Sequence, residues 1–135
     1  MEILVFGHGG TPVIVFPTSM GRFYDYEDRG MVDALRGPRN SGAVQLFCVD
    51  SVDAESLYNR SATPRVRIVR HTQFDRYVLT EVIPFVFGKT PDRRLVVTGC
   101  SFGGYHAMNF ALRHPADVHG CVSLSGVFDI KPFLD

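Results

Sequence analysis

The chain has 135 residues, of which 45% are hydrophobic and 21% charged, a composition that suits one globular domain with a buried core and excludes a disordered chain. Fourteen basic and fourteen acidic residues leave a formal net charge of zero, so no overall field would attract nucleic acid or an anionic membrane. No apolar run approaches the roughly 18 residues that a membrane span needs, and the first ten residues, MEILVFGHGG, lack the basic start of a signal peptide.

Three cysteines, Cys48, Cys100 and Cys121, are spread along the chain. Their odd number and wide spacing indicate neither a disulfide framework nor a zinc site. We therefore expect a cytoplasmic protein that uses no metal and no organic cofactor.

Short apolar runs that end at turn residues predict three strands in the first half of the chain, at Ile3–Phe6, Val13–Phe16 and Val44–Val49. Apolar residues at helical spacing predict a helix from Asp25 to Leu35, which we expect to end near Gly37-Pro38 because both residues interrupt helices. Residues 53–60 are expected to form a short helix or turn.

The second half of the chain alternates helices with strands. A long helix is predicted from Arg67 to Phe87, with Pro84 as a possible kink near its end. The apolar face of this helix comprises Ile68, Phe74, Val78, Val82, Ile83 and Val86. The elements that follow are a strand at Leu95–Thr98, a helix at Phe102–His114 and a strand at Gly120–Leu124.

This alternation predicts an α/β fold in a single domain over residues 1–135. We expect a mostly parallel sheet of about five strands with helices on both faces, since parallel strands are joined by helical crossovers that cover the sheet. In such folds ligands bind beyond the carboxyl ends of the strands.

Ser101 lies at one of these strand ends, within Gly99-Cys100-Ser101-Phe102-Gly103, which fits the G-x-S-x-G pattern of a nucleophile elbow. The turn between strand and helix is sharp, so the residues two before and two after the serine must be small. Gly99 and Gly103 meet that need, and Gly104 allows the helix to lie close to the sheet. Ser101 is therefore the candidate nucleophile; the alternative is a serine that only caps the helix.

An acyl-transfer serine also needs donors for an oxyanion. The backbone N–H of Phe102, at the helix N-terminus, is the natural first donor. The loop Pro17–Arg22 follows a neighbouring strand, and we expect Ser19 or Met20 to supply the second donor. The alternative is that this loop is an ordinary strand–helix connection.

A base for the serine is harder to find. His106 lies on the nucleophile's own helix and is expected to pack against the sheet or a neighbouring helix. His114 lies at that helix's end, His119 starts a strand at the opposite edge, and His71 lies early in the long helix. Asp129 follows the last predicted strand and is either a displaced triad acid or, more simply, the cap of the next turn.

Other polar and aromatic residues near the carboxyl edge of the predicted sheet have two interpretations. Asp50, Ser51 and Asp53 follow a strand and either line a pocket or form an Asx turn. The aromatic segment after the Ser19 loop either walls an acyl pocket or packs in the core; it contains Arg22, Phe23, Tyr24 and Tyr26. Cys100 is expected to point into the core. His8-Gly9-Gly10 resembles an esterase oxyanion motif but precedes its strand, so we read it as a connecting turn.

The sequence resembles the α/β-hydrolase superfamily, in the elbow GCSFGGYHAMNFALRHP and in the order of its elements. The segments HGGTPVIVFPTSMGRFYDYEDRGMVDAL and RYVLTEVIPFV are similar to bacterial esterases of the esterase D-like group. This resemblance implies hydrolysis of a small carboxylic ester through an acyl-serine at Ser101, with Phe102 and the Ser19–Met20 loop as the oxyanion hole. Acyl transfer to another acceptor would use the same residues.

Members of that group continue with two further strands that deliver the acid and the histidine, and they begin with one more strand before Met1–Phe6. The resemblance therefore implies a domain truncated at both ends, with an incomplete triad and weak activity. A histidine supplied by another copy, such as His106 or His114, would complete it. The alternative is a non-catalytic scaffold. In either case the strand at Gly120–Leu124 becomes an apolar sheet edge, for which we expect homo-oligomerisation.

Overall fold

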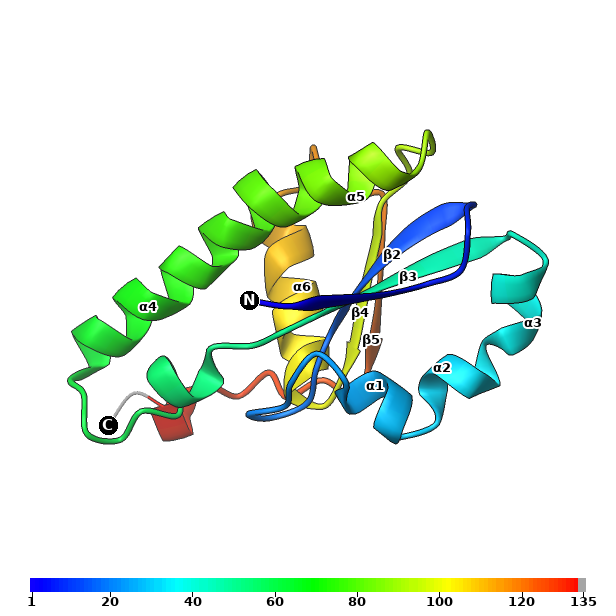
Figure 1. Ribbon diagram of the computed structural model, residues 1–135. Helices are drawn as coiled ribbons and strands as arrows, with labels where there is room; N and C mark the ends of the chain where they lie inside the picture. The colour runs from blue at the N-terminus through cyan, green and yellow to red at the C-terminus, as the bar shows by residue number, and fades with distance from the viewer. Residues whose placement is uncertain (134–135) are drawn as a thin grey trace.

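Five strands form one sheet in the computed structural model, which describes residues 1–133 (Figure 1). The strands are β1 (Ile3–Phe6), β2 (Thr11–Phe16), β3 (Val44–Val49), β4 (Val96–Cys100) and β5 (Gly120–Leu124), in the order β1-β3-β2-β4-β5. Only β1 runs antiparallel, paired with β3 from Ile3 opposite Val49 to Phe6 opposite Leu46. The mostly parallel five-stranded sheet is thus confirmed.

The interior strands are the continuous apolar runs of the sequence. In β2 and β3 most residues are buried, because helices cover both faces of the sheet. The edge strand β5 instead alternates between half-buried and exposed residues. Burial therefore follows the position of each strand in the sheet.

One long helical rod covers one face, together with the helix that follows Ser101. The rod consists of α4 (Pro64–Tyr77), a π-helical segment (Val78–Val82) and α5 (Ile83–Lys89), and the second helix is α6 (Phe102–Arg113). The prediction of a long helix was correct, but Ile68 is 47% exposed and does not belong to its buried face. The π-helical segment lies directly before Pro84, where the absent N–H interrupts the regular hydrogen-bond ladder.

Three short helices cover the other face: α1 (Asp25–Asp28), α2 (Met31–Ala34) and α3 (Arg36–Asn40). The prediction of a single helix here was wrong. Gly30 has a φ of +80°, a left-handed conformation that breaks the helix, whereas Gly37-Pro38 lies inside α3 instead of ending a helix.

Two short 3₁₀ turns complete the described chain, η1 (Asp53–Glu55) and η3 (Lys131–Phe133). The first agrees with the expected short helix or turn after β3. No helix within residues 1–133 is long and apolar enough to cross a membrane.

Candidate active site

Ser101 lies between the end of β4 and the first residue of α6, in a conformation that L-residues rarely adopt, with φ +57° and ψ −119°. Its backbone is firmly held. The N–H donates to the carbonyl of Leu124 at 2.9 Å, and the carbonyl accepts from the N–H of Gly104 at 3.0 Å. A strained and well-anchored backbone at the carboxyl edge of a parallel sheet is what a nucleophile elbow requires.

Close backbone contacts explain the glycines around Ser101. A Cβ atom on Gly99 would lie 2.4 Å from the carbonyl carbon and oxygen of Gly103. A Cβ atom on Gly103 would lie 2.4 Å from the carbonyl oxygen of Phe16, at the end of β2. The start of α6 therefore sits directly against the strand that leads into the Ser19 loop.

The first turn of α6 presents unbonded N–H groups, as every helix start does. Phe102 opens this turn, and its side chain is buried in a cluster with Leu57 and Phe133. Its ring meets the ring of Tyr58 edge-on at 5.3 Å between centroids. The packing of this side chain fixes the position of its backbone N–H.

The loop after β2 is fixed by two carboxylates. The N–H of Thr18 donates to Asp25 at 3.1 Å, and the N–H of Met20 donates to Asp53 at 2.9 Å. The amide between them, that of Ser19, has no hydrogen-bond partner within residues 1–133. Of the two predicted second donors, Met20 is therefore already engaged inside the protein, which favours Ser19.

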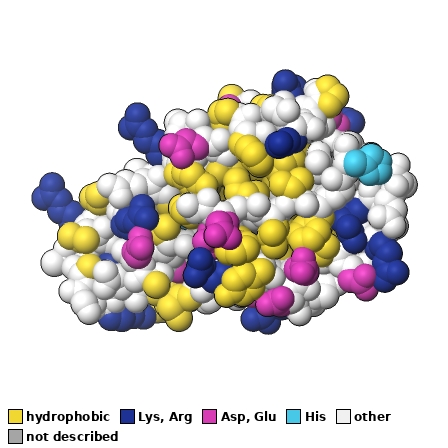
Figure 2. Space-filling model, in the orientation of Figure 1, with side chains coloured by type: hydrophobic (Ala, Val, Ile, Leu, Met, Phe, Trp, Pro, Cys, Tyr) yellow, Lys and Arg dark blue, Asp and Glu magenta, His cyan; other side chains and the backbone are white. Residues whose placement is uncertain are grey.

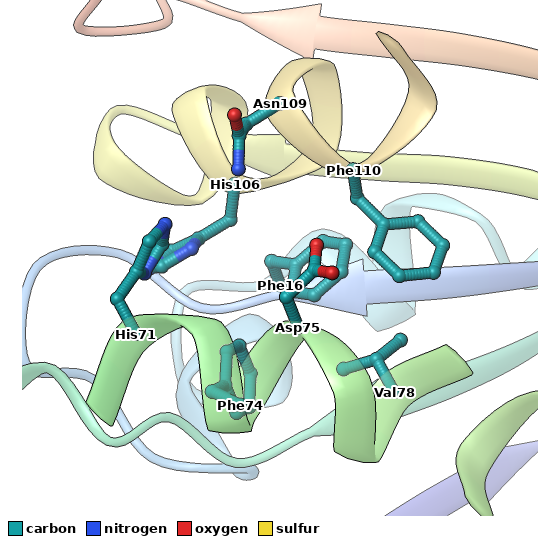
Figure 3. A pocket seen from close by; sticks show the side chains of 8 residues that line it. All are labelled: Phe16, His71, Phe74, Asp75, Val78, His106, Asn109 and Phe110. Atoms are coloured by element: carbon teal, nitrogen blue, oxygen red, sulfur yellow. The ribbon is translucent and has the colours of Figure 1, made fainter. Parts of the chain in front are cut away.

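His106 lies on the buried side of α6, as expected for a packing residue. It is 4% exposed, and its Nε2 lies 2.8 Å from Oδ1 of Asp53. Figure 3 shows His106 facing His71 of α4, with Phe16 and Phe74 beside them. Burial, together with the neighbouring His106, lowers the pKa of His71 to about 4. His71 is therefore neutral at physiological pH.

The other histidines lie farther from the elbow. His114, which caps the end of α6, lies with Nε2 2.8 Å from Asp75 of α4. His119 precedes β5 and bonds through its N–H to Leu95, before β4, and His8 lies in the turn between β1 and β2. Both are at the opposite edge of the sheet from Ser101. Within the described chain, no histidine is hydrogen-bonded to Ser101.

The polar residues after β3 are tied to the Ser19 loop. Both carboxylate oxygens of Asp50 accept hydrogen bonds from the guanidinium of Arg22, at 2.8 and 3.2 Å. Asp50 also accepts the N–H of Ser51, which agrees with the Asx-turn reading, and the hydroxyl of Ser51 donates to the carbonyl of Gly21. Pairing with Asp50 raises the pKa of Arg22.

The remaining candidates have structural roles. Tyr26 and Cys100 pack in the core between the sheet and α1–α3, whereas Tyr24 is exposed and contacts the ring of Phe23. Asp129 accepts the N–H of Lys131, which confirms it as the cap of the next turn. Within residues 1–133 no three or more His, Cys, Asp or Glu side chains are placed to bind a metal ion.

Sequence reasoning missed two contacts at this edge, those of Asp53 with His106 and of Asp50 with Arg22. The residues of each pair lie 53 and 28 positions apart, and both acids were interpreted through local turns. The only signal in the sequence was the clustering of acids directly after a buried strand.

The chain is similar to known proteins over most of its length. The family model described as "Putative esterase" matches residues 48–133. A search of curated proteins found no match. Among solved structures, S-formylglutathione hydrolase from Staphylococcus aureus is 20% identical with a TM-score of 0.68, over 96% of this chain and 48% of that one.

Two further solved structures share the fold. The fluorophosphonate-binding serine hydrolase F of Staphylococcus aureus is 18% identical with a TM-score of 0.62, over 94% of this chain and 46% of that one. A ferulic acid esterase is 17% identical with a TM-score of 0.60, over 87% of this chain and 46% of that one. The chain thus spans about half the length of these structures.

Proposed function

Because the chain belongs to the "Putative esterase" family, we propose that it derives from a serine esterase whose nucleophile is Ser101. The observation that carries the proposal is the backbone of Ser101, with φ +57° at the carboxyl edge of the sheet. Such strain persists only where the surrounding structure holds it, and it is typical of functional sites.

The proposed reaction is hydrolysis of a small carboxylic ester. The Oγ of Ser101 attacks the ester carbonyl, and the alcohol leaves with the proton that the serine gives up. Water then attacks the acyl-serine, which releases the carboxylic acid and returns the proton to Ser101. The negative charge on the carbonyl oxygen would be stabilised by the N–H groups of Phe102 and Ser19.

Among the described residues, no histidine is placed to act as the general base for Ser101. His106 and His114 are each bonded to a carboxylate inside their own chain, which argues against supply of either by another copy. We therefore expect Ser101 in this chain to react slowly, with the oxyanion donors giving a residual rate. The competing proposal is a scaffold in which Ser101 is inert.

A fluorophosphonate probe followed by mass spectrometry tests the proposal. Wild-type protein should be modified at Ser101 and should hydrolyse p-nitrophenyl acetate, and Ser101→Ala should do neither. Ser125→Ala is the matched control, because Ser125 also has a positive φ, +51°, after the neighbouring strand β5. Equal rates in wild type and Ser101→Ala would establish the inert scaffold instead.

A further inference from the structure

Asp53 is a buried carboxylate whose two oxygens join separate parts of the site. Its side chain lies in η1 and is 1% exposed. Oδ2 accepts the N–H of Met20 at 2.9 Å, and Oδ1 lies 2.8 Å from Nε2 of His106. We propose that Asp53 is a positioning residue that sets the oxyanion loop against the helix of Ser101. This inference rests on the proposed function for its consequence in catalysis.

The loop needs such a partner because of its backbone. Met20 has a φ of +53°, which is unfavourable for a residue with a side chain. A hydrogen bond from its N–H to a charged acceptor offsets that cost, and burial strengthens the bond. With Met20 turned towards Asp53 and Thr18 turned towards Asp25, the N–H of Ser19 is left for a ligand.

His106 connects the same carboxylate to the nucleophile's helix. It lies on α6, and its ring is surrounded by those of Phe16, Phe74 and Phe102 at centroid distances of 4.8 to 5.8 Å. This aromatic shell excludes water from the bond to Asp53. The position of the loop is therefore coupled to the position of α6, and Figure 3 shows His106 directed from α6 towards α4.

A second contact between the same segments supports this role. The hydroxyl of Tyr58 donates to Oγ of Ser19 at 2.8 Å, and the Tyr58 ring packs against Phe102. The carbonyl of Asp53 in turn accepts the N–H of Tyr58 at 2.9 Å. Residues 53–58 thus touch both proposed oxyanion donors, Ser19 and Phe102.

The substitution Asp53→Asn keeps the size and shape of the side chain but changes its hydrogen-bonding groups. An asparagine of the same size has one acceptor oxygen and an NH₂ group that only donates. Its oxygen can still accept from Met20, but only as a neutral and weaker acceptor, and its NH₂ group can bond to His106 only where Nε2 carries no proton. We expect the rate of fluorophosphonate modification at Ser101 to fall about 10- to 100-fold, the range expected when a reacting group is misplaced.

The matched control is Asp75→Asn, which alters the other aspartate–histidine pair of α6, in which Asp75 also lies 3.4 Å from Arg113. Asp75 is buried on α4 and lies 2.8 Å from His114 at the far end of α6. This variant should lose stability in the same way but should keep the wild-type modification rate. Equal rates in Asp53→Asn and Asp75→Asn would overturn the inference.

Rescue provides a readout that a purely structural role would not give. Glycine adopts a positive φ without strain, so Met20→Gly should restore part of the rate lost in Asp53→Asn. Failure of the double variant to exceed Asp53→Asn, with both proteins folded, would also overturn the inference.

Amide hydrogen exchange in the wild-type protein tests the contact without any reaction or variant. The N–H of Met20 should exchange much more slowly than the N–H of Ser19, and equal exchange would overturn the inference. If wild-type Ser101 is not modified at all, the proposed function fails. Even in that case, the rate of hydrogen exchange at the Met20 N–H shows whether Asp53 holds the loop.

Discussion

At the scale of single residues, burial controls the chemistry of the titratable groups under the site. His71 lies in an aromatic environment, where its Nε2 is 3.4 Å from the hydroxyl of Tyr105 and its Nδ1 is buried without a partner among the described residues. A charge is costly in such a place, and the pKa of His71 accordingly falls from 6.5 to about 4.

This shift predicts a pH dependence of stability. Between pH 6.5 and about 4 the unfolded chain binds a proton at His71 that the folded chain does not, so acid favours unfolding. Stability should therefore be lost as the pH falls through that window, by at most about 3 kcal/mol from this residue. Urea denaturation from pH 7 to 4.5 should show a shallower loss for His71→Gln, and parallel curves for the two proteins would contradict the assignment.

Backbone contact around the elbow predicts a second residue-scale effect. Gly103→Ala places a methyl group against the carbonyl oxygens of Phe16 and Pro17, at 2.4 and 2.5 Å before any adjustment. Backbone cannot move aside as a side chain can, so we expect a loss of at least about 2 kcal/mol in unfolding free energy. Gly9→Ala, whose Cβ would meet nothing within 4 Å, should unfold like the wild type. A wild-type urea midpoint for Gly103→Ala would show that the elbow is looser than described.

At the scale of elements, two helical regions depart from regularity for different reasons. The rod from Pro64 to Lys89 absorbs Pro84 through a π-helical segment and remains continuous, because α4 and α5 both bury side chains against the sheet. The region from Asp25 to Asn40 breaks into three helices at a left-handed glycine. Pro84 therefore leaves the rod continuous with a π-helical segment before it, whereas Gly30 ends a helix.

The left-handed conformation of Gly30 predicts that a glycine-to-alanine substitution there has the opposite effect to the same substitution at Gly88. A Cβ atom would meet nothing within 4 Å at Gly30 or at Gly88, but only Gly30 has a positive φ. Gly30→Ala should destabilise the protein by about 1 kcal/mol, since alanine is strained in the left-handed region. Gly88→Ala, in α5, should stabilise it by about 0.5–1 kcal/mol through lower backbone entropy in the unfolded chain. Thermal unfolding compares the three proteins, and changes of the same sign would contradict this account.

At the scale of the whole molecule, the sheet has two open edges, β1 and β5. Figure 2 shows hydrophobic side chains in the middle of the visible face, and the exposed residues along β1 and the adjacent α5 include Met1, Val5 and Phe85. At the other edge, Val122 and Leu124 of β5 are exposed beside an apolar groove that reaches under α2 and α3. Unpaired strands with apolar side chains favour association.

We propose that β5 pairs with another copy of the chain, and we predict that Val122→Lys reduces this association. Val122 is 52% exposed, and a lysine there would place a charge at the centre of the edge. Leu112→Lys, at a 73% exposed position on α6, is the control for loss of one apolar side chain. Light scattering after size-exclusion chromatography should show an oligomer for wild type and control and a monomer for Val122→Lys. A monomeric wild type would refute pairing at this edge.

The sequence alone determined the strands, the long helix, the α/β class and the position of Ser101 in its turn. These features depend on residues close together in the chain. Apolar runs specify the buried strands. The glycines two positions to either side of Ser101 allow the sharp turn, because a Cβ atom on either would lie 2.4 Å from neighbouring backbone. Pro84 also indicated where the long helix would be irregular, but the break at Gly30 was not expected, and Gly37-Pro38 does not end a helix.

Tertiary structure decided which donors and acids of the site work together. Asp53 meets Met20 from 33 residues away and His106 from 53 residues away. A carboxylate after a strand can satisfy its oxygens within its own turn, as Asp129 does with Lys131, or with a distant amide. The local sequence is compatible with either hydrogen-bonding arrangement of the carboxylate. Only the packing of α6 and the Ser19 loop against η1 brings the distant partners within hydrogen-bond distance and removes the water that would compete for them.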